Sequence, residues 1–158
     1  MMKIWLLYVF LVSFAVYWAS NLILWFPWSV SEVLGMTLML TVSPVIWAYS
    51  TYQSLRTYPF DKPYHSAIIV SLFFLVVSVV FDYIFFGHIR GAMEELYHPT
   101  TFYGYGFVLS VPFLAIAFFG KSIRAKRKDL SSRDLRKVFY VGLMCFLSIA
   151  LILLFEKI

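Results

Sequence analysis

The stretch SAIIVSLFFLVVSVVFDYIFF, residues 66–86, contains a single charged side chain, that of Asp82. A transmembrane helix needs about 20 mostly apolar residues to cross ~30 Å of hydrocarbon, and this run has that length and character. Four further runs of the same kind are present, at 4–26 (stopped by Pro27), 33–55, 101–119 and 138–155. The sequence therefore predicts five membrane-spanning helices.

The composition of the 158-residue chain supports the same class. Hydrophobic residues make up 62% and charged residues 13%, whereas a soluble domain has about 25% charged residues. A chain this short has too much surface for its volume to hide so many apolar side chains in a core of its own. The first run is also too long for the apolar segment of a signal peptide, and no A-x-A cleavage site follows it. We expect an all-α integral membrane protein, a small bundle of five transmembrane helices forming one domain over residues 1–158.

The basic residues predict the orientation of the chain. If the N-terminus is cytoplasmic, the segments 1–3, 56–65 and 120–137 face the cytoplasm and carry eleven of the thirteen Lys and Arg residues. Short basic loops stay in the cytoplasm. We therefore expect a cytoplasmic N-terminus, a C-terminus outside and a polar outer loop at 87–100. The expected location is the plasma membrane, which is the inner membrane in a Gram-negative cell.

The segment KSIRAKRKDLSSRDLRK, residues 121–137, supplies most of the formal net charge of +5. Its simplest interpretation is a topology signal, and the alternatives are contact with anionic lipid headgroups or a dock for a partner. It has no aromatic residues on which bases could stack and it contains two acids, so we do not expect nucleic acid as a partner. Within it, SSRD can cap an amphipathic helix that leads into the last span.

Polar and small residues recur at helical spacing inside the spans. In lipid such residues mark the faces by which helices pack together, because no hydrophobic force acts between helices there. A polar cavity between the first, third and fourth spans is the alternative interpretation. The residues of this predicted packing face are Ser13, Tyr17, Asn21, Ser71, Ser78, Gly106 and Ser110.

Asp82 is the only acidic residue well inside a span. A carboxylate in hydrocarbon costs at least ~2.5–3.5 kcal/mol on insertion scales, so an ionisable group there is a candidate functional site. Asp82 lies about one turn from the outer end of its helix, where we expect a structural Asp–Arg or Asp–Tyr pair or a titrating group. The candidates for a ligand or ion pathway are Asp82, His88, Arg90, Glu94, Glu95, His98 and Tyr105.

The outer loop 87–100 is expected to form a short helix or turn that caps a shallow vestibule on the outer surface. Gly87 and Gly91 allow the chain to leave the third span and change direction. Pro99 is expected to end the turn, because the residue before a proline is pushed out of the helical region. Thr100 or Thr101 can then cap the fourth span.

Metal and catalytic chemistry are poorly supported. Glu94 and Glu95 stand one helical turn before His98, but di-iron bundles need a second Glu-x-x-His motif, which is absent. The single Cys145 excludes an internal disulfide and a cysteine-only metal site. Neither paired intramembrane acids nor a nucleophile elbow nor a phosphate loop is present. We expect no metal, no cofactor and no catalytic residue.

Three functional hypotheses follow. The first is a non-catalytic membrane component, either a subunit of a larger assembly or a binder of a small ligand or lipid. The second is a proton- or ion-coupled transporter that works as a homo-oligomer, with Asp82 as its titrating group. The third is an outer-leaflet enzyme that uses Asp82 with the His and Glu residues of the 87–100 loop. Convergence of these groups on one cavity would favour the second and third hypotheses, and their dispersal would favour the first.

Overall fold

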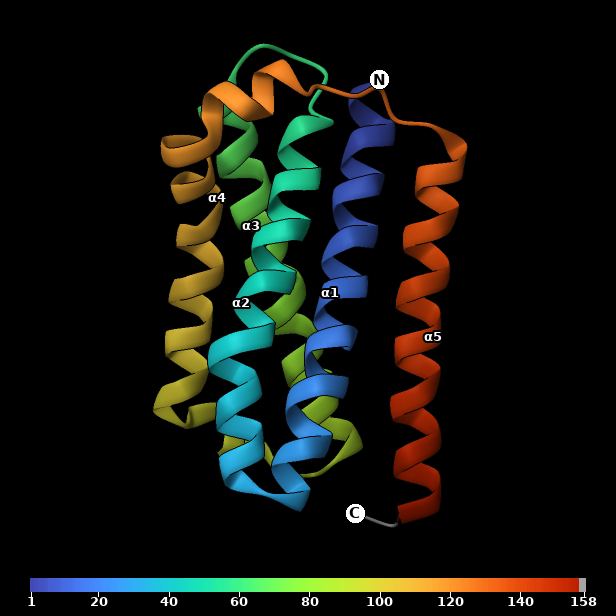
Figure 1. Cartoon of the computed structure of the whole chain (residues 1–158). Coiled ribbons are helices and arrows are strands. Elements are labelled where there is room, and N and C mark those ends of the chain that lie inside the picture. The colour runs from blue at the N-terminus through green and yellow to red at the C-terminus, as the bar shows by residue number, and fades with distance from the viewer. Residues whose placement is uncertain (157–158) are drawn as a thin grey trace.

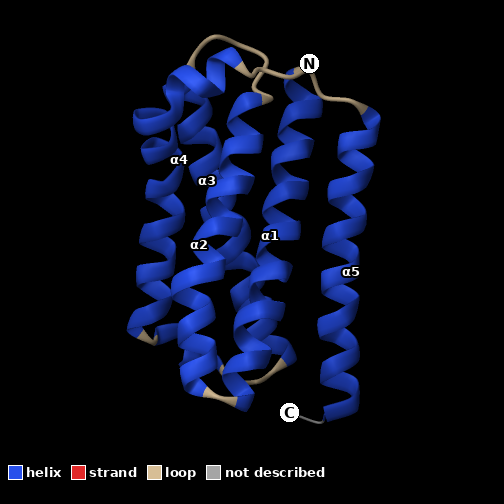
Figure 2. Ribbon diagram, in the orientation of Figure 1, coloured by secondary structure: helices blue, strands red, loops and turns tan. Residues whose placement is uncertain are grey.

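The computed structural model describes residues 1–156, and this part of the chain is helical with no β-strand (Figure 2). The five long helices are α1 (Met2–Val30), α2 (Glu32–Arg56), α3 (Pro63–Asp82), α4 (Pro99–Ala125) and α5 (Ser132–Glu156). A π-helical segment, η1 (Tyr83–Ile89), extends α3, and a short 3₁₀ helix, η2 (Met93–Tyr97), precedes α4. Each of the five long helices has the length and the hydropathy needed to span a membrane. The all-helical fold with five such helices is therefore as predicted.

The helix ends differ from the predicted ones at the prolines. Pro27 does not stop α1, which continues to Val30, and the backbone N–H of Ser31 donates to the Pro27 carbonyl at 2.8 Å. Proline disrupts a helix through the turn that precedes it, so the turn after Pro27 can still form. Ser31 is extended and its side chain then accepts from the N–H of Leu34 to cap α2.

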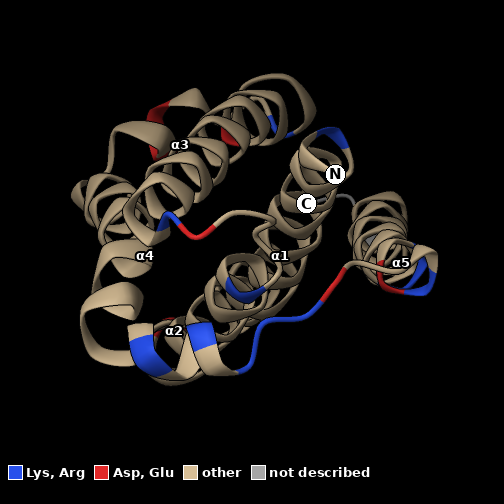
Figure 3. Ribbon diagram, turned by 90° about the horizontal axis from the view of Figure 1, so that it is seen from above, with Lys and Arg blue, Asp and Glu red and all other residues tan. Residues whose placement is uncertain are grey.

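Helix α1 lies at the centre of the bundle. It packs against α2, α3 and α5, while α4 packs against α2 and α3 (Figures 1 and 3). Helix α5 therefore stands outside the group formed by α1–α4 and rests on α1. Gly142 makes this approach close, because a Cβ atom there would lie 2.7 Å from the Phe14 ring and 3.1 Å from the Ala15 Cα atom.

The buried residues form two aromatic-rich clusters along α1. The larger cluster surrounds Trp5, Trp47 and Phe74, and joins the first four helices. The smaller one surrounds Trp18 and Phe85, and joins α1, the end of α3 and α5. Many large apolar side chains on the outer faces of the helices are exposed, which is expected of a bundle whose solvent is lipid.

Eleven Lys and Arg residues gather at one end of the bundle, which we call the basic end. Figure 3 looks down on this end, where α1, α3 and α5 begin and α2 and α4 finish. At the opposite end the described basic residue is Arg90, beside Glu32, Glu94 and Glu95. The start of α1 and the end of α5 also lie at opposite ends (Figure 1). The members of the basic end are Lys3, Arg56, Lys62, Lys121, Arg124, Lys126, Arg127, Lys128, Arg133, Arg136 and Lys137.

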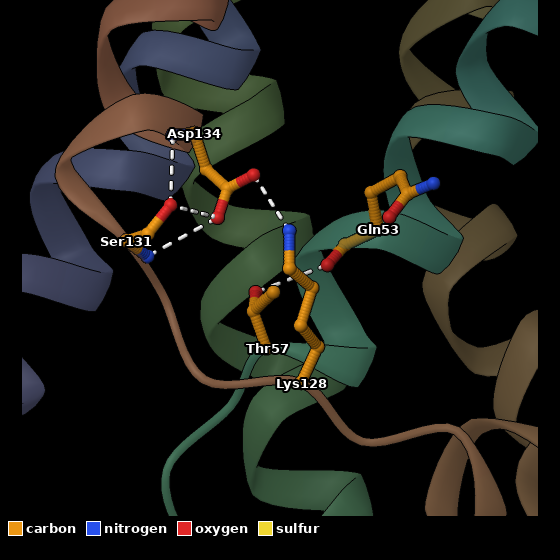
Figure 4. A network of polar contacts seen from close by, with 5 residues as sticks. All are labelled: Gln53, Thr57, Lys128, Ser131 and Asp134. Atoms are coloured by element: carbon orange, nitrogen blue, oxygen red, sulfur yellow. Dashed lines mark hydrogen bonds and ion pairs between the residues drawn. The ribbon is translucent and has the colours of Figure 1, made fainter.

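The segment 120–137, expected to be a loop, is mostly helical. Helix α4 runs to Ala125 and α5 begins at Ser132, so the connection is short. Basic residues can lie within these helix ends because their long side chains reach polar surroundings from there. As the SSRD motif predicts, Ser131 caps α5: its Oγ accepts from the Asp134 N–H at 3.2 Å and donates to the Asp134 carboxylate at 2.7 Å (Figure 4).

Candidate functional site

The Asp82 carboxylate joins three helices. It lies at the last residue of α3, where the chain widens into η1. The Tyr17 hydroxyl of α1 donates to one carboxylate oxygen at 2.8 Å, and the Tyr105 hydroxyl of α4 donates to the other at 2.6 Å. Asp82 therefore faces the first and fourth helices, which confirms the expected Asp–Tyr pair. The expected alternative, an Asp82–Arg90 pair, is not formed.

Packing around Tyr17 sets the position of its hydroxyl. Its side chain is 3% exposed, and its ring lies 5.1 Å from the Trp18 ring and 5.4 Å from the Phe81 ring, measured between centroids. The Asn21 side chain, one turn further along α1, donates to the Tyr17 carbonyl at 3.1 Å and so does not reach Asp82. A buried aromatic ring with few rotamers holds its hydroxyl in one place, so Tyr17 is a preorganised donor.

The chemistry available at Asp82 follows from these two donors. Each carboxylate oxygen accepts one hydroxyl, and hydrogen bonds to an ionised acceptor are roughly twice as strong as neutral ones. Within residues 1–156 no His, Lys or Arg contributes to the contact, and the partners of Asp82 are the two tyrosine hydroxyls. The arrangement is suited to hold the outer ends of α1, α3 and α4 together.

Arg90 is occupied by contacts within the outer end. Its guanidinium forms an ion pair with Glu95 of η2, and its side chain is 15% exposed. The guanidinium carbon also lies 5.2 Å from the Trp25 ring centroid and 5.4 Å from the Phe86 ring centroid. A planar guanidinium stacks favourably on aromatic faces. Arg90 therefore anchors the outer loop to α1 through the Trp25 ring. This role of Trp25 was not predicted from the sequence.

The remaining polar groups of the loop are dispersed. His88 packs edge-on against the Tyr83 ring at 5.0 Å between centroids. His98 Nδ1 pairs with the Thr100 hydroxyl at 2.8 Å and accepts weakly from the Thr100 N–H at 3.4 Å. Glu94 is exposed. Among the described residues, no three His, Cys, Asp or Glu side chains are close enough together to hold a metal ion.

The path of the outer loop is partly as predicted. Gly91 has a φ of +62°, the left-handed conformation that glycine adopts without strain, and η2 forms the expected short helix. The start of α4 is not as predicted. His98 caps it in place of Thr100 or Thr101, and Pro99 opens the helix as its first residue, where a missing N–H costs nothing.

The predicted packing face is divided between buried and exposed positions. Ser13, Ser71 and Ser78 are buried, and the Ser71 hydroxyl donates to the Leu109 carbonyl of α4 at 2.9 Å. Gly106 and Ser110 are exposed, and the Ser110 hydroxyl turns back to the Gly106 carbonyl of its own helix. Within the described chain these last two residues make no interhelical face, so their packing role stays a prediction for contact with another chain.

A second set of polar contacts joins the helices at the basic end. No pattern in the sequence predicted these contacts. The indole N–H of Trp5 donates to the Ser54 carbonyl at 3.0 Å, and the Arg127 guanidinium donates to the Tyr58 carbonyl at 3.0 Å. The Tyr58 hydroxyl is hydrogen-bonded to His65 Nδ1. Burial raises the pKa of Tyr58, so the hydroxyl keeps its proton.

Asp82 lines none of four cavities along the described chain, although an apolar one of about 470 Å³ on α3 includes its neighbours Phe81 and Ile84. A cleft of about 510 Å³ lies at the basic end, between the start of α1, the turn after α2 and the 126–131 connection. A groove of about 470 Å³ lies nearby and is lined by α1, α2 and α5. Neither is lined by Asp82 or by any residue of the 87–100 loop. Comparison of the chain with family models, curated proteins and solved structures finds no match.

Proposed function

We propose that this chain is a non-catalytic, multi-pass component of the plasma membrane that acts as a subunit of a larger membrane assembly or as a lipid binder. The observation that carries the proposal is the dispersal of its polar groups. Asp82 is held by two tyrosine hydroxyls, Arg90 by Glu95 and two aromatic rings, and His98 by the cap of α4. A transporter or an acid–base enzyme needs such groups to converge on a cavity.

The proposal assigns Asp82 a structural role at the outer end of the bundle. A carboxylate at this depth is costly unless its oxygens are hydrogen-bonded, and both of them accept a hydroxyl. The exposed apolar faces of α2 and α5 are available to lipid or to a partner chain. Exposed Gly106 and Ser110 on α4 add a small-residue pair of the kind found where membrane helices meet.

The proposed orientation places the basic end in the cytoplasm and the Asp82 end outside. Reporter fusions at successive connections test it, because each reporter is active on only one side of the membrane. Fusions at Tyr58 and Ala125 should report the cytoplasm. Fusions at Ser29, at Ala92 and at the C-terminus should report the outside, and a cytoplasmic C-terminus would contradict the arrangement.

The experiment that tests the non-catalytic role is a flux measurement with a purification arm. The purified protein is reconstituted into vesicles, a proton or sodium gradient is imposed, and its decay is followed for the wild type and for Asp82→Asn. We expect both proteins to give the same decay as protein-free vesicles. A flux present in the wild type and lost in Asp82→Asn would overturn the proposal in favour of the transporter. Identification of chains and lipids that co-purify then separates the assembly subunit from the lipid binder.

A further inference from the structure

A lateral groove lies between α2 and α5, with α1 as its floor. Both helices pack against α1 but hardly against each other (Figures 1 and 3). The groove is lined by residues of all three helices. Its volume of about 470 Å³ falls within the ~300–1,000 Å³ typical of small-molecule sites. On the α1 side the groove is lined by the small side chains of Ala15 and Ala19, which leave room for a ligand.

The lining of the groove changes character along its length. Toward the basic end it carries the cations Arg56, Lys128 and Lys137 with one acid, Asp134. The polar side chains of Tyr8, Tyr49, Ser50 and Gln53 follow along the helices. Further toward the middle of the bundle the lining is apolar and consists of Val12, Ala15, Val16, Ala19, Ile46 and Val141. A ligand that fits this groove has an anionic group at one end and a hydrocarbon chain at the other.

The length of the groove matches one leaflet of a bilayer. Along α2 it runs from Arg56 to Ile46, which at 1.5 Å per residue is about 15 Å. This is half of the ~30 Å hydrocarbon thickness. A lipid from the leaflet at the basic end would therefore place its headgroup at the cations and its chain along the apolar part.

Arg56 provides an independent sign of a missing polar partner. Its Nε atom is buried and has no hydrogen-bond partner among the described residues. Its guanidinium carbon lies 6.0 Å from the Tyr52 ring centroid. Lys128 is already paired with Asp134 at 2.6 Å (Figure 4), so Arg56 and Lys137 are the cations available to a ligand.

We propose that the groove binds one anionic membrane phospholipid, with its phosphate at Arg56 and Lys137 and one acyl chain along Ala15 and Ala19. The inference rests on the proposed placement of the chain in the membrane. A phosphate accepts several hydrogen bonds from a guanidinium. A second protein helix, about 10 Å wide, would fill the apolar part but leave the buried Arg56 donor without an acceptor.

The test measures lipid retained by the protein. The full chain is purified from vesicles of phosphatidylglycerol and phosphatidylcholine in equal amounts, and bound lipid is counted by native mass spectrometry. The wild type should retain one phosphatidylglycerol in preference to phosphatidylcholine. Each cation near a lipid surface contributes about fivefold in affinity, so Arg56→Gln with Lys137→Gln should weaken retention by about 25-fold. Its control, Lys121→Gln with Lys126→Gln, removes two charges from the same end outside the groove and should change retention less than twofold.

A steric variant keeps the test independent of charge. Ala19→Phe should fill the groove floor and abolish retention, whereas Ala48→Phe on the exposed face of α2 should not. Any of three results would overturn the inference: equal loss of lipid from the two charge variants, equal retention of both lipids by the wild type, or full lipid retention by Ala19→Phe. Displacement of the lipid by inorganic phosphate alone, or a co-purified protein cross-linked at Ala19, would overturn it too. Alkaline washing of membranes separates the failures: a chain that washes off refutes the membrane proposal, and an embedded chain without lipid preference refutes only the lipid site.

Discussion

Replacing Tyr17 by Phe should lower the free energy of unfolding by about 1–2 kcal/mol. The change removes the hydroxyl that donates to Asp82 at 2.8 Å and keeps the ring contacts with Trp18 and Phe81. A hydrogen bond to a charged group contributes about 1.5–3 kcal/mol in soluble proteins. Side-chain hydrogen bonds between membrane helices average only about 0.6 kcal/mol and reach about 1.7, because the unfolded chain in the membrane finds other partners. The charged acceptor places this bond at or above the upper part of that membrane range.

The assay is unfolding of the protein in mixed micelles by increasing dodecyl sulfate, followed by tryptophan fluorescence. Tyr83→Phe is the matched control, because it deletes the same atom from a neighbour of Asp82 whose side chain is 49% exposed and does not contact the carboxylate. Its effect should stay within about 0.5 kcal/mol. A double-mutant cycle sharpens the result: in an Asp82→Asn background Tyr17→Phe should cost less than half as much. Equal shifts for Tyr17→Phe and Tyr83→Phe, or an undiminished cost in that background, would refute the structural role of Asp82.

Three further substitutions test the packing. Gly142→Ala places a methyl group against the backbone of α1 and should destabilise the bundle by about 1–3 kcal/mol in the same unfolding assay, whereas Gly104→Ala, with open space around it, should be neutral or stabilising by up to about 1 kcal/mol. Gly91→Ala forces a side chain into the left-handed region and should cost about 1–2 kcal/mol. Arg90→Lys loses the planar contact with two aromatic rings, so limited proteolysis of the outer loop should become several-fold faster while the five helices remain.

The five long apolar helices could be predicted because they depend on length and composition alone. A run such as 66–86 has few ways to satisfy its backbone other than a helix in lipid. The inward orientation of Asp82 was also predictable, since the insertion cost penalises a lipid-facing carboxylate. Tyr17, Asn21, Tyr105 and Arg90 were all possible partners of an inward Asp82. The choice among them was not predictable, because it depends on how α1 and α4 rotate about their axes. No local pattern reports that rotation.

Some helix ends and the groove could not be predicted from the sequence, for different reasons. Pro27 was expected to stop the first span, yet it lies inside the last turn of α1. Pro99 does follow the end of η2, with His98 extended as predicted, but it also opens α4. A proline restricts the residues on one side only, so its position within a turn decides its effect. The groove exists because α5 docks on α1 and leaves α2 uncovered. A single glycine, Gly142, permits that docking, and an isolated glycine in an apolar run gives no sign of what approaches it.

The two ends of the bundle are held by different kinds of contact, and this difference bears on function. At the outer end Asp82 is closed by neutral hydroxyl donors, and Arg90, the described cation there, is matched by Glu95. At the basic end Arg127 donates to the Tyr58 carbonyl and lies 3.9 Å from the Asp61 carboxylate, which it shares with Arg124. The Nε atom of Arg56 has no acceptor among the described residues. Eleven cations face only three acids in that region of the sequence, Asp61, Asp129 and Asp134. If the proposed lipid site is correct, an anion from outside the chain would stabilise the basic end more than the outer end. The composition of the membrane would then act on the protein at the basic end.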